Sequence, residues 1–185
     1  EYQTSNKGKL VFLKEFEENL TKELELEDVK LLKEMKGSDL ELVVCKHPFY
    51  DRDSLVINGT HVTNDAGTGL VHTAPGHGVE DYQVCLKYPG RGLEPYCPVD
   101  EKGYMMPGTG EGIEGLFYEQ ANDAVLKIIS ENGALLKHTT FTHSYPHDWR
   151  TNKPLIFRAT SQWFCSIEPI REKLLEAIHG VKWYP

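Results

Sequence analysis

One short stretch of the chain gathers side chains that could carry chemistry. Residues 67–82 read GTGLVHTAPGHGVEDY, in which His72 follows the apolar pair 70–71 and Asp81 stands where a helix is expected to begin. Imidazoles and carboxylates serve as general acids and bases, as metal ligands or as binding groups for cations. The glycine-rich turns on either side predict a buried strand that delivers His72 to a turn, followed by a helix start that holds Asp81.

Each of these side chains also has an ordinary structural explanation. A carboxylate such as Asp81 in the first turn of a helix is stabilised by the helix dipole by about 0.3–1 kcal/mol. Its functional alternative is recognition of an ammonium group through a charge-assisted hydrogen bond. His72 and His77 could join Asp81 as metal ligands, or His72 could act as a general base, but the chain contains no H-E-x-x-H pattern and we expect no metal. The chain also lacks a G-x-S-x-G elbow, so attack by water is favoured over a covalent nucleophile.

Composition narrows the class of protein. The 185 residues suit a single domain, and the net charge of −8 argues against a general nucleic-acid coat. Residues 137–160 are locally basic, which indicates either an anionic partner on that edge or only a solvated face. No apolar run is long enough to span a membrane, so no membrane association is expected. The four widely spaced cysteines fit reduced thiols in a cytoplasmic protein better than a zinc site.

The hydrophobic pattern predicts an α+β fold, a curled and mainly antiparallel β-sheet or barrel core with a few peripheral helices. Amphipathic periodicity predicts the helices, and turn-forming residues such as Asn58-Gly59 predict hairpins. The predicted helices are 15–27, 79–88, 118–132 and 169–179, and the predicted hairpins join 29–35 to 40–45 and 54–57 to 61–63. Further strands are predicted at 10–13, 135–145, 155–160 and 162–166. Irregular structure is predicted for the loops 46–52 and 146–154 and for a Gly- and Pro-rich excursion or lid at 89–115.

The chain resembles the editing domain of the isoleucyl-tRNA synthetase family. The pattern GTG-x-VHTAPGHG-x-x-DY, preceded by HVTNDA at 61–66, carries the resemblance, and the stretches 46–52, 143–150 and 157–164 match the same family. The likeness therefore extends over nearly the whole chain. In the leucyl and valyl relatives the G-T-G turn and the aspartate persist but the position of His72 differs, so His72 selects the isoleucyl branch.

The resemblance implies a single editing domain over 1–185, cut from a larger class I synthetase, with the stretch from about 160 to 185 leading back toward the catalytic domain. Its activity would be hydrolysis of valyl-tRNA(Ile), and of valyl-adenylate, to keep valine out of proteins. A binding pocket discriminates weakly against one missing methylene, a limit for which this synthetase is the standard example, and a second hydrolytic pocket removes the error. The full-length enzyme would be an isoleucine–tRNA ligase that uses ATP, an activity not expected of this segment.

The resemblance also assigns roles to residues. Asp81 would hold the α-ammonium group of the substrate, and His72 would lie beside the aminoacyl group, exclude isoleucine and position the ester. Water held by backbone, hydroxyl groups and the terminal ribose of the tRNA would attack, with no metal or cofactor, since ATP and magnesium belong to the catalytic domain. The floor of the pocket would be formed by Gly67, Thr68, Gly69, Leu70 and Val71.

The partners implied are the acceptor end of tRNA(Ile), valine or a valyl ester, and the rest of the synthetase chain, with the segment itself monomeric. A threonine-rich segment that supplies hydroxyls to the pocket in the family would precede Glu1, and residues 139–140 stand in a different sequence context. The resemblance therefore implies that the complete pocket includes hydroxyls from that preceding segment. A non-catalytic module that docks the tRNA acceptor end and a metallohydrolase are the alternative hypotheses.

Overall fold

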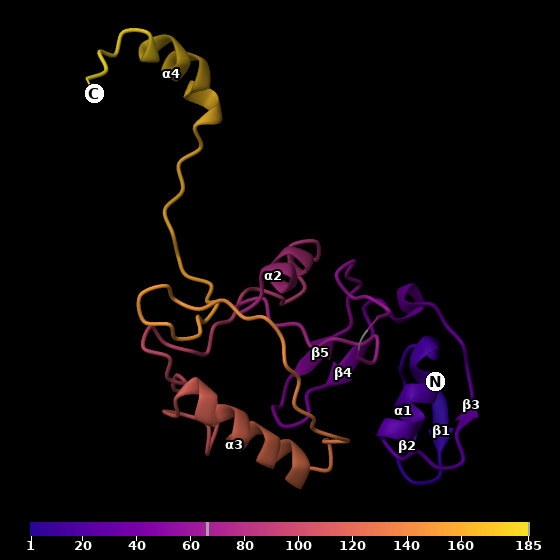
Figure 1. Ribbon diagram of the computed structural model, residues 1–185. Helices are drawn as coiled ribbons and strands as arrows, with labels where there is room; N and C mark the ends of the chain where they lie inside the picture. Colours follow the sequence, from indigo (N-terminus) through magenta and orange to yellow (C-terminus); the bar gives the residue numbers. More distant parts are fainter. Residues whose placement is uncertain (66, 185) are drawn as a thin grey trace.

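The computed structural model describes residues 1–65 and 67–184, so Ala66 of the 61–66 motif and Pro185 lie outside the described residues. These residues form an α+β structure of small antiparallel sheets and helices (Figure 1). In chain order the elements are β1 (Tyr2–Thr4), β2 (Gly8–Leu10), η1 (Lys14–Phe16), α1 (Glu17–Glu23), β3 (Lys30–Leu31), η2 (Gly37–Leu40), β4 (Val44–Lys46), β5 (Asp53–Leu55), α2 (Val79–Cys85), α3 (Tyr118–Glu131), η3 (Glu168–Ile170) and α4 (Arg171–Ile178), where η marks a 3-10 turn.

The N-terminal part of the chain builds its own small core. Strands β2, β1 and β3 form an antiparallel sheet in that order, and Phe16 and Leu20, four residues apart, turn the apolar side of η1 and α1 onto it. Tyr2 stacks on Phe12 with ring centroids 4.3 Å apart. The predicted helix over 15–27 is confirmed in its central part, because regular helix ends at Glu23 and Leu26 turns back into the core.

The second sheet is a hairpin that the sequence analysis did not predict. Strand β4 pairs with β5 around the loop 47–52, with Cys45 opposite Ser54. Both predicted hairpins are therefore wrong: β3 pairs with β1, and 61–63 contains no strand. The Asn58 amide donates to the Tyr88 hydroxyl at 3.1 Å, so the Asn-Gly turn is anchored beyond α2 and does not close a hairpin.

The remaining predicted strands are also wrong. Strand β2 ends at Leu10, and the stretches 135–145, 155–160 and 162–166 contain no strand. A bridge between His147 and Pro154 and single backbone hydrogen bonds replace a ladder, since these extended segments find no continuous neighbour. The strands that do form have two or three residues each, and no closed barrel exists in the described residues. The α+β class is confirmed, but the curled sheet or barrel core is not found.

The predicted helices after residue 78 are confirmed. Helix α3 is followed by Asn132 at its C-cap and Gly133 at φ 67°, the left-handed position that glycine favours. On α2 the buried residues are Val84 and Cys85. Figure 1 shows α4 at the end of an extended segment, apart from the other elements, and its apolar stripe is half-exposed. In the part of the chain that is described, no helix has the length and apolarity needed to cross a membrane.

The buried Tyr2 should make the N-terminal core less stable at alkaline pH. Burial, together with a 2.9 Å hydrogen bond from its hydroxyl to Glu17 Oε2, raises the pKa of Tyr2 to about 12 from 10.0. The unfolded chain therefore loses this proton first, and stability should fall as the pH rises from about 10 to about 12. Urea denaturation of Tyr2→Phe, measured over the same pH range, should not show this loss of stability. An unchanged alkaline decline in Tyr2→Phe would contradict the assignment, and Tyr184→Phe, an exposed tyrosine, is the control.

Candidate functional site

The G-T-G turn, residues 67–69, is fixed by a contact with Leu13 in the N-terminal part of the chain. Gly67 and Gly69 have φ of 76° and 78°, a conformation that side chains disfavour. The Leu13 amide donates to the Thr68 carbonyl at 2.8 Å, and a Cβ on Gly69 would lie 2.6 Å from the Leu13 Cβ. The turn therefore needs glycine both for its backbone and for the close approach of Leu13.

The apolar pair after this turn does not form the buried strand that was predicted. Leu70 and Val71 are 49% and 57% exposed, and residues 70–74 contain no strand. The Thr68 hydroxyl both donates to the Leu70 carbonyl and accepts from its amide, at 3.0 and 3.2 Å, so the turn is closed by its own side chain.

The second turn, residues 75–78, joins two distant segments. Gly76 is buried, and a Cβ there would lie 2.1 Å from the Tyr96 carbonyl oxygen. The Gly76 carbonyl accepts from the Ala159 amide at 2.8 Å, and His77 Nδ1 lies 2.8 Å from the Phe157 carbonyl oxygen. The sequence motif 157–164 thus meets the central motif through one backbone hydrogen bond and one contact from the His77 ring.

Asp81 lies in the first turn of α2, as predicted. Its Oδ2 accepts from the Ala74 amide at 3.2 Å, and its Oδ1 lies 3.8 Å from His61 Nε2. The side chain is 22% exposed, so the carboxylate is partly sheltered from solvent. Gly78 at the N-cap makes room for it, since a Cβ there would lie 2.4 Å from Oδ2.

His72 belongs to a different environment from Asp81. It lines a cavity of about 690 Å³ between α3 and the excursion 89–115, and Asp81 is not among the lining residues. The structure therefore places both predicted site residues at the ends of one motif without bringing them to one cavity. The lining residues are His72, His77, Pro98, Val99, Met105, Tyr118, Ala121, Asn122, Val125, Leu126, His138 and Ile156.

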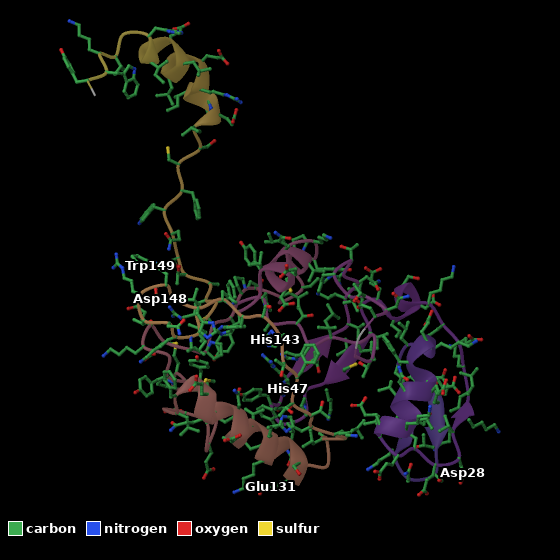
Figure 2. All side chains as sticks on the ribbon, in the orientation of Figure 1. Asp28, His47, Glu131, His143, Asp148 and Trp149 are labelled. Carbon is green, nitrogen blue, oxygen red and sulfur yellow. The ribbon has the colours of Figure 1, made fainter. Side chains whose placement is uncertain are left out.

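The cavity lining is mostly apolar, and the pKa of His47, a histidine near His72, is lowered. Burial lowers the pKa of His47 below 6.5, and the nearby Arg52 and His72 side chains act in the same direction. His47 Nδ1 also accepts from the amides of Phe49 and Tyr50, at 3.3 and 3.1 Å, which favours the neutral ring. His47 stands in the loop between β4 and β5 (Figure 2).

The structure also bears on the metal hypothesis. Within 1–65 and 67–184, no three His, Cys, Asp or Glu side chains gather to hold a metal ion. His72, His77 and Asp81 therefore do not form a ligand set, although they lie close together in the sequence.

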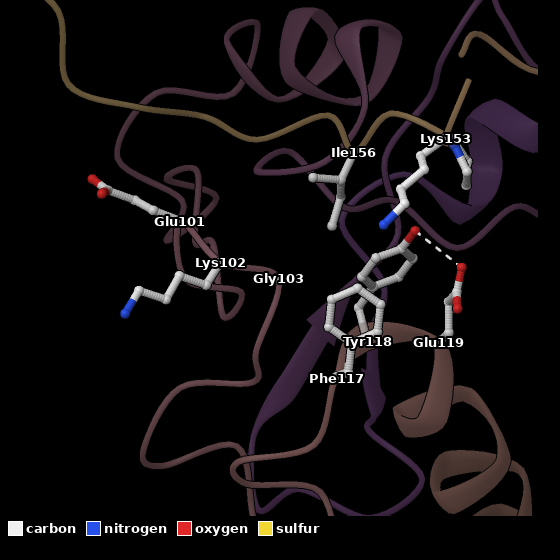
Figure 3. Close-up of a pocket in the computed structure, with 9 residues that line it drawn as sticks. Glu101, Lys102, Gly103, Phe117, Tyr118, Glu119, Lys153 and Ile156 are labelled. Carbon is white, nitrogen blue, oxygen red and sulfur yellow. Dashed lines mark hydrogen bonds between the residues drawn. The ribbon is translucent and has the colours of Figure 1, made fainter. Parts of the chain in front are cut away.

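A second cavity of about 450 Å³ adjoins the first, and the two share Tyr118 and Ile156. Figure 3 shows Lys102 and Glu101 on one side of it and Lys153 on the other. Acidic and basic side chains are thus mixed in its lining, which does not favour a simple anion site.

Sequence reasoning did not assign roles to His61 or His47. His61 was quoted only as the start of the 61–66 motif, and its contact with Asp81 joins two separate parts of the chain. No local pattern points to such a contact. Residues 75–78 gave a clearer signal, because glycines on both sides of His77 indicate close backbone approach.

Comparison with known proteins shows where these motifs occur. No protein-family model matches the chain. Over 180 residues, 97% of the chain, it is 57% identical to the isoleucine–tRNA ligase of Bacillus mycoides (strain KBAB4) and 56% identical to that of Bacillus cereus (strain B4264). The chain is homologous to one segment of the isoleucine–tRNA ligases. Isoleucine–tRNA ligase 1 of Bacillus thuringiensis subsp. konkukian (strain 97-27) is likewise 57% identical, and the chain spans 19% of the length of each of these ligases.

The Gly76 contact predicts a specific loss of stability. In Gly76→Ala the new methyl group would overlap the Tyr96 carbonyl, and a backbone atom cannot move aside as a side chain can. We expect the free energy of unfolding to fall by about 1–3 kcal/mol. Urea denaturation provides the measurement. Gly37→Ala is the matched control, since its Cβ would meet only Asn58 Oδ1 at 3.6 Å, and equal losses in both variants would contradict this packing.

Proposed function

We propose that this segment is the editing domain of an isoleucyl-tRNA synthetase and hydrolyses the ester of valine wrongly attached to tRNA(Ile). The single observation that carries the proposal is Asp81, a partly sheltered carboxylate that is held in place by the Ala74 amide at a helix start. The homology to isoleucine–tRNA ligases supports the same proposal. The complete enzyme would work in the cytoplasm and attach isoleucine to tRNA with ATP and magnesium bound in its catalytic domain.

In this proposal Asp81 binds the α-ammonium group of the misattached amino acid. An ionised carboxylate accepts through both oxygens, and only part of this capacity is used by Ala74. A hydrogen bond between opposite charges is about twice as strong as a neutral one, so this contact would fix one end of the substrate. The ester carbonyl would then be held in a defined direction from that point.

His72 would select by size at the other end of the motif. The residues near it line a mostly apolar cavity, which suits an uncharged aliphatic side chain. The turn 67–69 and the exposed pair 70–71 would form the floor of the pocket in the assembled enzyme. The attacking water would be positioned by backbone, hydroxyl groups and the terminal ribose, and editing would need no metal or cofactor.

A docking module for the tRNA acceptor end is the second candidate. The observation in its favour is a surface aromatic and basic cluster, in which the Arg150 guanidinium lies 4.6 Å from the ring centroid of the exposed Trp149 (Figure 2). Such pairs offer stacking and charge to unpaired nucleotides. Docking of this kind would be independent of Asp81, which separates it from the editing proposal.

Replacing Asp81 tests the editing proposal directly. In the full-length synthetase, Asp81→Ala should lower kcat/KM for valyl-tRNA(Ile) hydrolysis about ten- to hundredfold, because a hydrogen bond to a charged group contributes about 1.5–3 kcal/mol. Isoleucine activation by the same variant should be unchanged. The matched control is Glu80→Ala, which removes the exposed neighbouring carboxylate on the same helical turn. Undiminished hydrolysis by Asp81→Ala would leave docking as the better hypothesis.

Replacing His72 tests the selection by size. His72→Ala should let isoleucyl-tRNA(Ile) be hydrolysed, weakening the preference for the valyl ester by at least about fourfold, since one buried methylene is worth about 0.8 kcal/mol. Deacylation of both esters by the full-length variant gives the ratio. His147→Ala, an exposed histidine outside the cavity, should keep the original preference. If His72→Ala keeps it too, His72 has no part in selectivity.

A further inference from the structure

The imidazole of His61 faces the carboxylate of Asp81 from a separate part of the chain. His61 follows the Asn58-Gly59 turn, whereas Asp81 belongs to α2. Their closest atoms, Nε2 and Oδ1, are 3.8 Å apart, and both side chains are more than three-quarters buried. The separation exceeds a hydrogen bond, but a shift of the ring by about 1 Å would form one.

His61 Nε2 is a buried nitrogen without a hydrogen-bond partner among the described residues. A buried polar atom left unpaired is costly, so such an atom in a folded protein calls for an explanation. Asp81 Oδ1 is the charged acceptor beside it, and its companion Oδ2 already accepts from Ala74. Together the two neighbours restrict rotation of the carboxylate.

Two glycines make room for the two side chains. A Cβ on Gly59 would lie 2.5 Å from His61 Cε1, and a Cβ on Gly78 would lie 2.4 Å from Asp81 Oδ2. Neither glycine has a positive φ, so backbone conformation does not require glycine at either position. The common property of these glycines is the space they leave for the imidazole and for the carboxylate.

We propose that His61 is a positioning residue for Asp81. Its ring nitrogen orients Oδ1, so that the lone pairs not engaged by Ala74 face the incoming ammonium group. His61 itself touches no substrate and transfers no proton. The inference rests on the proposed editing function and assigns to it a residue outside the central motif.

The first test replaces the imidazole in the full-length synthetase. His61→Leu should raise KM for valyl-tRNA(Ile) hydrolysis about tenfold with little change in kcat, because Asp81 would hold the ammonium group equally in the bound substrate and in the transition state. His61→Gln keeps an N–H donor of similar reach and should restore most of the loss. Isoleucine activation should be the same in all three proteins, which shows that the catalytic domain is intact, whereas recovery in His61→Gln shows that the loss in His61→Leu is not a folding defect of the segment.

The second test moves the ring without removing it. Gly59→Ala should displace the imidazole and raise KM in the manner of His61→Leu, while Gly37→Ala, an unobstructed glycine, should not. A double-mutant cycle then asks whether His61 acts through Asp81. In an Asp81→Asn background, His61→Leu should cause no further rise in KM, whereas an independent structural role would add its full effect.

The outcomes separate the two proposals. If Asp81→Ala lowers kcat/KM for hydrolysis as expected but His61→Leu leaves KM unchanged, or if the two effects are additive, the role of His61 is overturned and editing stands. If the unmodified synthetase does not remove valine from tRNA(Ile), the editing function fails and the role of His61 fails with it.

Discussion

The turn at residues 75–78 is the constraint on which the site depends. Because Gly76 lacks a side chain, the Tyr96 carbonyl can approach from one direction while the Gly76 carbonyl accepts from Ala159. Three segments that are far apart in sequence thereby meet at one backbone position. The excursion 89–115 reaches back to the same place, where Arg158 Nε donates to the Val99 carbonyl at 2.7 Å. Because no strand in the described residues is longer than three residues, these individual contacts hold the central part of the fold.

The helix that follows this turn gives Asp81 more than a favourable dipole. An ordinary first-turn carboxylate such as Glu80 is exposed to solvent and needs no other group. Asp81 instead accepts from Ala74, lies beside His61 and occupies the space that Gly78 leaves. The Asp81 charge also acts within the helix. Burial raises the pKa of the Cys85 thiol, and the nearby Asp81 carboxylate raises it further. These contacts distinguish a positioned group from a surface charge.

Sequence reasoning predicted the helices far better than the strands. Helices α1 and α3 carry periodic apolar residues and, for α3, a glycine stop, and both signals are local. Strand pairing depends on partners far along the chain, so Asn58-Gly59 predicted a hairpin, whereas the Asn58 amide is bonded to Tyr88 and no strand follows the turn at 61–63. For the same reason Leu70 and Val71 were expected in a buried strand and lie on the surface. Local propensity contained no information about the surroundings of Asn58 or of the pair 70–71.

The candidate site shows the same division between local and distant information. Glycine spacing and residue type marked His72 and Asp81, but their surroundings come from elsewhere in the chain: His61 faces the carboxylate, and His47 lies near His72. The surroundings differ in a way that suits two tasks. Around His72, burial favours the neutral form of His47 and apolar side chains line the cavity, conditions that favour an aliphatic group. At Asp81 the sheltered carboxylate favours a cation, because partial desolvation strengthens its attraction to opposite charge. In the proposed editing function an amino acid ester carries both features, an ammonium group and an aliphatic side chain, on one carbon, so the two environments would have to meet around it in the assembled synthetase, because Asp81 does not line the cavity of His72 in this segment.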